Sequence, residues 1–263
     1  MLQVEGLTKI FNRGTVNEKT ALSQVHLTLK AGDFVTIIGG NGAGKSTLLN
    51  SVAGVFPVDG GKITLGSRDV THLSEHKRAK YLGRVFQDPM MGTAADMNIE
   101  ENLALAYRRG KRRTLRWGVT SQERAKYREL LRELDLGLEN RMTDKVGLLS
   151  GGQRQALTLL MATLQAPDLL LLDEHTAALD PKTAAKVLGL TQKLVEENHL
   201  TTLMVTHNMH DAIRLGNRLI MMNEGRIAIE IDGDEKKALH KADLIALFEK
   251  AGGALENDRL LLS

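Results

Sequence analysis

The segment Gly39-Gly-Asn-Gly-Ala-Gly-Lys-Ser-Thr47 constrains this chain more than any other feature. It follows the apolar run 34–38, which predicts a buried parallel strand, and it leads into residues 46–53, which predict a helix. Glycines allow backbone N–H groups to converge on phosphate oxygens, and the helix start adds a positive dipole end. An ordinary glycine turn is the alternative, but the flanking strand and helix favour a phosphate-binding loop made of Gly39, Gly40, Asn41, Gly42, Ala43, Gly44, Lys45, Ser46 and Thr47.

The rest of the chain alternates between strand and helix patterns. Strands are predicted over 25–29, 34–38, 62–65, 169–172 and 201–205, and a hairpin over 219–222 and 226–231. Helices are expected from Asn98 to about Gly110, from Thr120 to about 134, over 181–197 after Asp180, and over 242–250 before Gly252. This order predicts an α/β fold with a mostly parallel sheet and helices on its faces.

Composition excludes several classes of function. The 263 residues include no cysteine, so disulfides, thiolate metal sites and cysteine nucleophiles are absent. A formal charge of +3 does not argue for nucleic acid as a partner. Apolar runs such as Leu169–Leu172 fall far short of the roughly 18 residues that cross a bilayer. No secretory signal is visible at the start, so we expect a soluble chain whose membrane role comes through a partner.

Two further segments narrow the family. Leu149-Ser-Gly-Gly-Gln153 reads as a capping box that opens an apolar helix, yet a well-capped helix alone does not explain its two glycines, which are poor helix formers. Leu169-Leu-Leu-Leu-Asp-Glu174 is an apolar strand that ends in two acids, as a metal site at the carboxyl end of a sheet requires. With the phosphate-binding loop, these segments resemble the signature sequence and the Walker B strand of the ABC transporter ATPases.

The resemblance covers nearly the whole chain and implies a P-loop NTPase fold of the ABC ATPase type. It implies one ABC ATPase domain over residues 1–263. Residues 1–87 and 166–263 would form the mostly parallel core with an antiparallel β subdomain, and residues 88–165 a helical lobe. The cofactors implied are ATP and Mg²⁺.

The resemblance also assigns roles to individual residues. Lys45 would contact the β- and γ-phosphates, Ser46 would ligate Mg²⁺, and Asp173 would hold that ion through water. Glu174 would orient and deprotonate the attacking water. Further matches are the γ-phosphate contact His207, the Mg²⁺- and water-sensing Gln87, and the 177–180 segment that follows the two acids. Phe11 has two equally weighted interpretations, stacking on adenine or packing in the apolar core.

In the family, two subunits sandwich two ATP molecules, so the resemblance implies a homodimer. Ser150, Gly151, Gly152 and Gln153 would then complete the nucleotide site of the partner subunit. The resemblance also implies integral membrane permease subunits, docked at a groove near residues 87–97, and an extracytoplasmic substrate-binding protein. The chain would therefore work at the cytoplasmic face of the cell membrane.

The segment 93–103 and the helix after Leu149 resemble ATPases of bacterial importers paired with permeases of the branched-chain amino acid and ribose type. Within that group they are similar to systems that take up aromatic amino acids. The favoured function is therefore ATP hydrolysis that energises solute uptake, with amino acids as the solute class. The alternatives are a two-gene exporter and a non-transport ATPase of the iron–sulfur assembly type.

Three features stand apart from the motifs. His175 occupies a position where the family usually has proline, and we expect activity to survive this change. The basic run 108–116 is interpreted as a solvated loop, with anionic lipid headgroups or an acidic permease surface as the alternative partners. Four methionines are expected in the core or filling gaps in it: Met90, Met91, Met221 and Met222.

Overall fold

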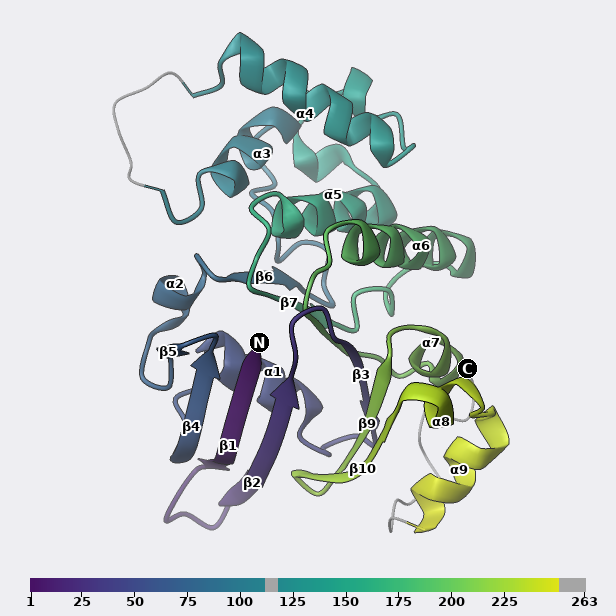
Figure 1. Ribbon diagram of the computed structural model, residues 1–263. Coiled ribbons are helices and arrows are strands. Elements are labelled where there is room, and N and C mark those ends of the chain that lie inside the picture. The colour runs from purple at the N-terminus through teal and green to yellow at the C-terminus, as the bar shows by residue number, and fades with distance from the viewer. Residues whose placement is uncertain (112–117, 251–263) are drawn as a thin grey trace.

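The computed structural model describes residues 1–111 and 118–250, arranged as two sheets with helices around them (Figure 1). One sheet has four antiparallel strands in the order β2-β1-β4-β5. Its strands are β1 (Leu2–Phe11), β2 (Lys19–Leu29), β4 (Gly60–Leu65) and β5 (Arg68–Asp69). Alternation in β2 puts Val25, Leu27 and Leu29 in the core, as the period-two pattern predicts.

The second sheet has six strands in the order β10-β9-β3-β8-β7-β6. All neighbours pair in parallel except β9 and β10, which form the predicted hairpin. The mostly parallel α/β architecture expected from the sequence is therefore confirmed. Its strands are β3 (Phe34–Gly39), β6 (Leu82–Val85), β7 (Leu169–Asp173), β8 (Thr202–Val205), β9 (Arg218–Asn223) and β10 (Arg226–Asp232).

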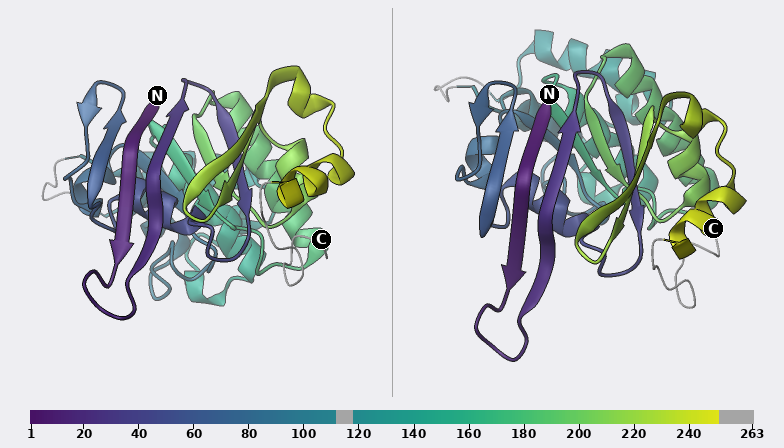
Figure 2. Two further views of the ribbon diagram at one scale, coloured as in Figure 1. Left: turned by 90° about the horizontal axis from the view of Figure 1, so that it is seen from below. Right: turned by 60° about the horizontal axis from the view of Figure 1, so that its bottom comes forward.

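Both faces of this sheet are covered, which explains the unbroken apolar runs. In β7, Leu169 and Leu171 pack in the cluster that contains α1 (Lys45–Ala53) and the four-stranded sheet. Leu170 and Leu172 face the opposite cluster, which contains α6 (Pro181–Glu197). A strand buried on both faces gains nothing from alternation, so it reads as continuously hydrophobic. Figure 2 shows α1 lying behind β1 and β2.

The segment between β6 and β7 is helical and has its own apolar cluster, drawn at the top of Figure 1. Reciprocal capping boxes begin three of its helices: Asn98 with Glu101, Thr120 with Glu123, and Ser150 with Gln153. Capping residues satisfy N–H groups that the first helical turn leaves unpaired, so the sequence located these starts well. The elements are α3 (Ile99–Tyr107), α4 (Ser121–Glu133), η1 (Leu138–Asn140), η2 (Val146–Leu148) and α5 (Gly151–Thr163).

The remaining helices are α2 (Glu75–Arg78), α7 (Met209–Arg214), α8 (Gly233–Lys237) and α9 (Lys241–Lys250). Asp180 caps α6 by accepting from Thr183 N, and Pro181 is its first residue, as expected. The predicted stop of α9 at Gly252 lies outside the described residues. No helix within residues 1–111 and 118–250 is long and apolar enough to cross a bilayer.

One expectation was wrong, and a second is contradicted only at its first two residues. Met221 and Met222 are buried as predicted, but Met90 and Met91 are 52% and 65% exposed, because the turn after β6 carries them outward. The basic run, which was interpreted as a solvated loop, begins with two arginines that contact neighbouring helices. Arg108 pairs with Glu123 at 3.0 Å, and the partly buried Arg109 donates to Ala162 O at 3.0 Å. These two arginines join helices; residues 112–116 of the run lie outside the described residues.

Candidate active site

The phosphate-binding loop connects β3 to α1 and can be built only with glycine at key positions. Gly39 has a φ of 151°, and a Cβ there would lie 2.3 Å from Met222 O. Gly44 has a φ of 102°, and a Cβ there would lie 2.6 Å from Ala21 O. Neighbouring strands therefore press against the loop from behind and hold its curvature. On its concave side, Lys45 Nζ donates to Gly39 O at 2.7 Å and to Gly40 O at 3.0 Å.

The carboxyl ends of four parallel neighbours meet at this loop. Gln87 follows β6 by two residues, Glu174 follows β7 directly, and His207 follows β8 by two residues. These ends share one edge of the sheet, where open α/β folds place their ligands. Segments far apart in the sequence thus deliver their polar side chains to one place, as the order of motifs predicts.

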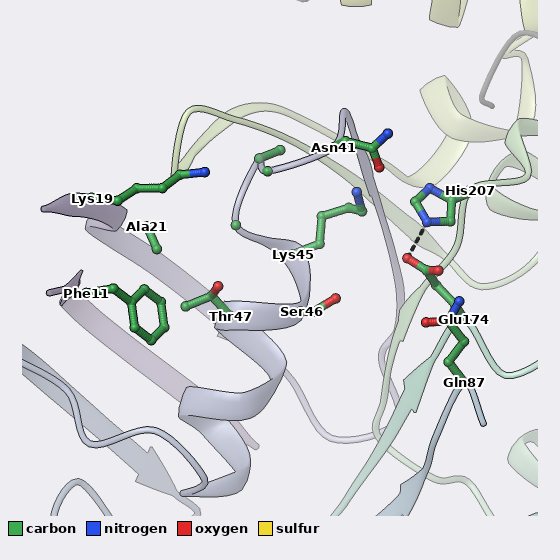
Figure 3. A pocket seen from close by; sticks show the side chains of 13 residues that line it. Phe11, Lys19, Ala21, Asn41, Lys45, Ser46, Thr47, Gln87, Glu174 and His207 are labelled. Atoms are coloured by element: carbon green, nitrogen blue, oxygen red, sulfur yellow. Dashed lines mark ion pairs between the residues drawn. The ribbon is translucent and has the colours of Figure 1, made fainter. Parts of the chain in front are cut away.

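These residues line a cavity of 610 Å³ (Figure 3). In Figure 3 the loop and α1 lie between Phe11 on one side and the pair Glu174 and His207 on the other. Every sequence-predicted residue of the loop from Asn41 to Thr47 is in the lining, together with Gln87. The full set is Phe11, Lys19, Ala21, Asn41, Gly42, Ala43, Gly44, Lys45, Ser46, Thr47, Gln87, Glu174 and His207.

The catalytic candidates Glu174 and His207 contact each other. Glu174 Oε1 lies 2.5 Å from His207 Nε2, while the Glu174 side chain is only 8% exposed. The contact holds the carboxylate at the rim of the cavity, on the side that faces Lys45 and Ser46. A buried carboxylate next to a phosphate-binding loop is placed to accept a proton from water that attacks a phosphate.

Ser46 and Asp173 meet beside the loop. Ser46 Oγ donates to Asp173 Oδ1 at 3.4 Å, so a hydroxyl and a carboxylate converge on one point. Burial, followed by the charge of Glu174, raises the pKa of Asp173, while Arg84 and Lys45 oppose that rise. Hard oxygen ligands of this kind suit Mg²⁺, which uses one or two protein groups and takes the rest from substrate phosphates and water. The two residues therefore fit the ion that the resemblance implies.

Phe11 combines features of both interpretations. Its ring makes an edge contact with Phe56, with centroids 5.3 Å apart, and Lys9 Nζ lies 5.3 Å from its centre. The side chain is only partly buried, and it forms part of the cavity wall. It is thus an aromatic ring at the rim of the site, supported from behind by a second ring.

The signature residues lie elsewhere on the molecule. Ser150 Oγ accepts from Gln153 N at 3.3 Å, and Ser150 N donates to Gln153 Oε1 at 3.2 Å, so both side chains begin α5. Ser150 and Gly151 are exposed, and none of residues 150–153 is in the lining of the cavity. Within one chain, the structure does not bring the signature to the phosphate-binding loop.

Sequence reasoning missed two kinds of residue. Lys19 and Ala21 of β2 line the cavity, and Lys19 Nζ would lie 3.4 Å from a Cβ placed on Gly42. Their inclusion depends on how β2 approaches the loop, which no local motif encodes. Arg84 was also missed, although it sits three residues before Gln87 and its charge opposes the rise in the pKa of Asp173.

Known proteins are similar to this chain in both sequence and fold. A family model described as ABC transporter matches residues 22–177, which include the loop, the signature and the two acids. The chain belongs to the ABC transporter family. A tyrosine transport ATP-binding protein of Clostridioides difficile is 44% identical to it over 255 residues, covering 95% of this chain and 100% of that protein.

Two other similar proteins extend the comparison. A methionine import ATP-binding protein of Oceanobacillus iheyensis is 32% identical, covering 88% of this chain and 65% of that protein. A dimeric ATP-binding cassette, solved in a post-hydrolysis state with ADP and phosphate, has a TM-score of 0.76 at 30% identity. The match covers 88% of this chain and 98% of that chain. The ABC ATPase fold expected from the sequence is therefore confirmed.

Proposed function

We propose that this ABC ATPase hydrolyses ATP as a homodimer and thereby energises the uptake of a solute through a separate bacterial permease. One observation carries the enzymatic part: the Glu174–His207 pair faces Lys45 and Ser46 across a single cavity. Lys45 would bind the β- and γ-phosphates, and Glu174 would take the proton of the attacking water. When bound between Ser46 and Asp173, Mg²⁺ would neutralise phosphate charge.

The other residues have supporting roles in this proposal. The His207 side chain would release Glu174 and contact the γ-phosphate. Gln87 would contact both the Mg²⁺ ion and the attacking water. Phe11 would stack on adenine, which is consistent with a ring that lines the cavity and is supported by Phe56. The backbone of Gly40 and its neighbours would surround the phosphates.

The dimer is proposed because one chain leaves the site incomplete. Exposed Ser150 and Gly151 lie at the start of a helix of 13 residues, and neither of them lines the cavity of its own chain. A partner's signature, offered at the N-terminus of α5, would supply bare backbone and a favourable dipole. The similar cassette with ADP and phosphate is dimeric, which supports this arrangement.

Import of an amino acid is the solute proposal. It is supported by the tyrosine transport relative, whose entire length aligns with this chain, and by the methionine import relative. Residues 88–165 would act as the helical lobe that carries motion to the permease, and exposed Met90 and Met91 would contribute to that contact. A substrate-binding protein on the outer side would complete an importer. A two-gene exporter and an iron–sulfur assembly ATPase remain the alternatives.

The enzymatic proposal is tested with Glu174→Gln. We expect this variant to bind ATP and form a stable ATP-dependent dimer, while phosphate release falls at least about a hundredfold because the general base is lost. Light scattering measures the dimer and a phosphate assay measures turnover. The control is Glu129→Gln, an exposed carboxylate on α4, which should change neither. Near-normal turnover by the Glu174 variant would remove that residue from its proposed role.

The transport proposal needs a separate experiment. The chain should co-purify with a membrane permease, and vesicles that contain both, loaded with ATP on the ATPase side, should take up labelled tyrosine in the presence of the binding protein. Co-purification with a soluble scaffold would favour the iron–sulfur alternative. Movement of solute only in the outward direction would favour the exporter.

A further inference from the structure

His175 follows Glu174 directly and is completely buried. Its Nε2 lies 2.9 Å from Thr191 Oγ1, and the Thr191 hydroxyl also lies 2.9 Å from Val187 O. A hydroxyl has one proton to donate, and the Val187 carbonyl can only accept, so Thr191 must accept from the imidazole. Nε2 of His175 therefore carries a proton and donates it to Thr191, and this hydrogen bond joins the loop after β7 to the middle of α6.

The backbone of Glu174 makes this loop unusual. Glu174 has a φ of 46°, a left-handed conformation that is rare for a residue with a side chain. Its N–H donates to Val205 O at 3.0 Å, and its carbonyl accepts from Ala177 N at 2.9 Å. Proline at position 175 would push Glu174 toward extended backbone. With histidine there, the left-handed conformation is accessible, and the His175–Thr191 hydrogen bond adds a side-chain contact to the two backbone bonds that hold it.

The same helix reaches the signature. A Cβ on Gly152 would lie 2.0 Å from Thr183 Cγ2, so the first turn of α6 presses directly on the start of α5. Thr183 and Thr191 are separated by eight residues, or about 12 Å along a rigid helix. One end of α6 thus touches the segment proposed to act on the partner's nucleotide, and its middle holds the residue next to this chain's own proposed base.

We propose that His175 is a positioning residue: through Thr191 it fixes Glu174 to α6, and so couples the carboxylate to the signature segment of the same subunit. This inference rests on the proposed role of Glu174. When the Thr191 bond is lost, both ring nitrogens of His175 lack a partner, since Nδ1 already has none in the described part of the chain. A buried imidazole without partners would shift, and the Glu174 loop would shift with it.

Loss of the His175–Thr191 bond should slow turnover without weakening ATP binding. The phosphate-binding residues 41–47 lie in the β3–α1 connection, whereas His175 lies in the loop after β7. Thr191→Val removes the acceptor but preserves the shape of the side chain. We expect kcat for ATP hydrolysis to fall about tenfold or more, with KM changed less than about twofold, since small displacements of a reacting group are costly. The matched control is Thr163→Val: Thr163 is buried, and its hydroxyl donates to Leu159 O at 3.0 Å, but it accepts from no histidine.

Two substitutions of His175 distinguish the hydrogen bond to Thr191 from the packing of the side chain. Glutamine places an amide N–H where Nε2 was, so His175→Gln should keep most of the wild-type kcat. Asparagine places its amide near the Nδ1 position and cannot reach Thr191, so His175→Asn should match Thr191→Val. If both act through one bond, the His175→Asn and Thr191→Val double variant should be no slower than the slower single variant.

Thermal unfolding is measured for every variant, and the turnover of Glu174→Gln is measured alongside them. Wild-type kcat for Thr191→Val, or an equal loss in Thr163→Val, would overturn the inference, as would a loss of kcat that merely follows a loss of folded protein. If Glu174→Gln itself retains turnover, the proposed function has failed instead. If Glu174→Gln is inactive and Thr191→Val is normal, only the inference about His175 has failed.

Discussion

At the scale of single residues, Asp33 holds the start of the strand that leads to the phosphate-binding loop. Its carboxylate accepts from Lys30 N at 2.8 Å and from Asn217 Nδ2 at 3.0 Å, and it pairs with Arg218 at 2.8 Å. Burial alone would raise the pKa of Asp33, but the bonds from Asn217, Lys30 and Arg218 outweigh burial and bring it below 3.8. The ionised form is therefore stabilised by the fold.

The lowered pKa of Asp33 predicts how the free energy of unfolding depends on pH. A folded pKa below the unfolded value gives stabilisation that is complete above the unfolded pKa and is lost as pH falls through and below it. We expect Asp33→Asn to lower the free energy of unfolding by about 2 kcal/mol at pH 7, and the difference from wild type to shrink toward pH 3. Denaturant unfolding at several pH values measures this.

Asp234→Asn serves as the comparison, because Asp234 is exposed and pairs with the also exposed Lys237 at 2.8 Å. Exposed pairs contribute little, so that variant should follow the wild-type curve. A constant difference between Asp33→Asn and wild type across the acid range would contradict the explanation.

A site residue could be predicted from the sequence when the residues that determine its position are adjacent to it in the chain. Lys45, Ser46 and Glu174 sit in motifs whose chemistry is contained in a few adjacent residues, so the sequence alone brought them to one cavity. Lys19 reaches the cavity from β2, and Asp33 accepts from Asn217, which is 184 residues away in the sequence, so no local pattern marks either residue. Met90 and Met91 were misplaced because hydrophobicity indicates a preference for burial, while the turn after β6 decides their direction.

At the scale of elements, the signature helix and α6 are in contact at glycine. The 2.0 Å approach between a Cβ on Gly152 and Thr183 Cγ2 leaves no space for a methyl group. A Cβ on Gly151 would instead lie 3.5 Å from Leu179 Cδ2, which is ordinary contact. Packing against α6 therefore requires glycine at position 152 but would allow a methyl group at position 151.

We expect Gly152→Ala to destabilise the isolated chain by about 2 kcal/mol, because the added methyl group forces α5 and α6 apart. Gly151→Ala should stay within about 0.5 kcal/mol of wild type. Thr183→Ser removes the obstructing methyl, so adding it to Gly152→Ala should recover much of the loss. Thermal or denaturant unfolding without nucleotide provides the measurement. Equal effects of the two alanine substitutions would show that packing against α6 is not the cause.

Elements with strong local signals were located well from the sequence. Capping boxes gave the starts of α3, α4 and α5, and apolar runs gave β3 and β7. What local patterns could not give is the order of strands, in which β3 lies between β8 and β9 although over 160 residues separate it from either. That order results from long-range packing around α1, with Leu48, Leu49 and Val52 buried in the cluster joining the two sheets.

At the scale of the whole molecule, the phosphate-binding loop and the signature of one chain serve different nucleotides in the proposed dimer. Each site then combines the Lys45 of one subunit with the Ser150 of its partner. Two variants with different lesions should therefore complement each other. Lys45→Ala disables the site formed by the phosphate-binding loop of the same subunit. Ser150→Arg disables the site of the partner subunit, which the altered signature would otherwise complete.

A mixed dimer of these two variants contains one doubly damaged site and one fully intact site. Each variant alone should be inactive, whereas an equal mixture should recover up to about a quarter of wild-type ATPase activity, since half of the dimers are mixed and each retains one of two sites. Mixing Lys45→Ala with the double variant Lys45→Ala, Ser150→Arg leaves no intact site and should recover nothing. Phosphate release from purified mixtures distinguishes these outcomes. If the first mixture stays inactive although both variants dimerise, or if Ser150→Arg alone is fully active, the signature does not complete its partner's site.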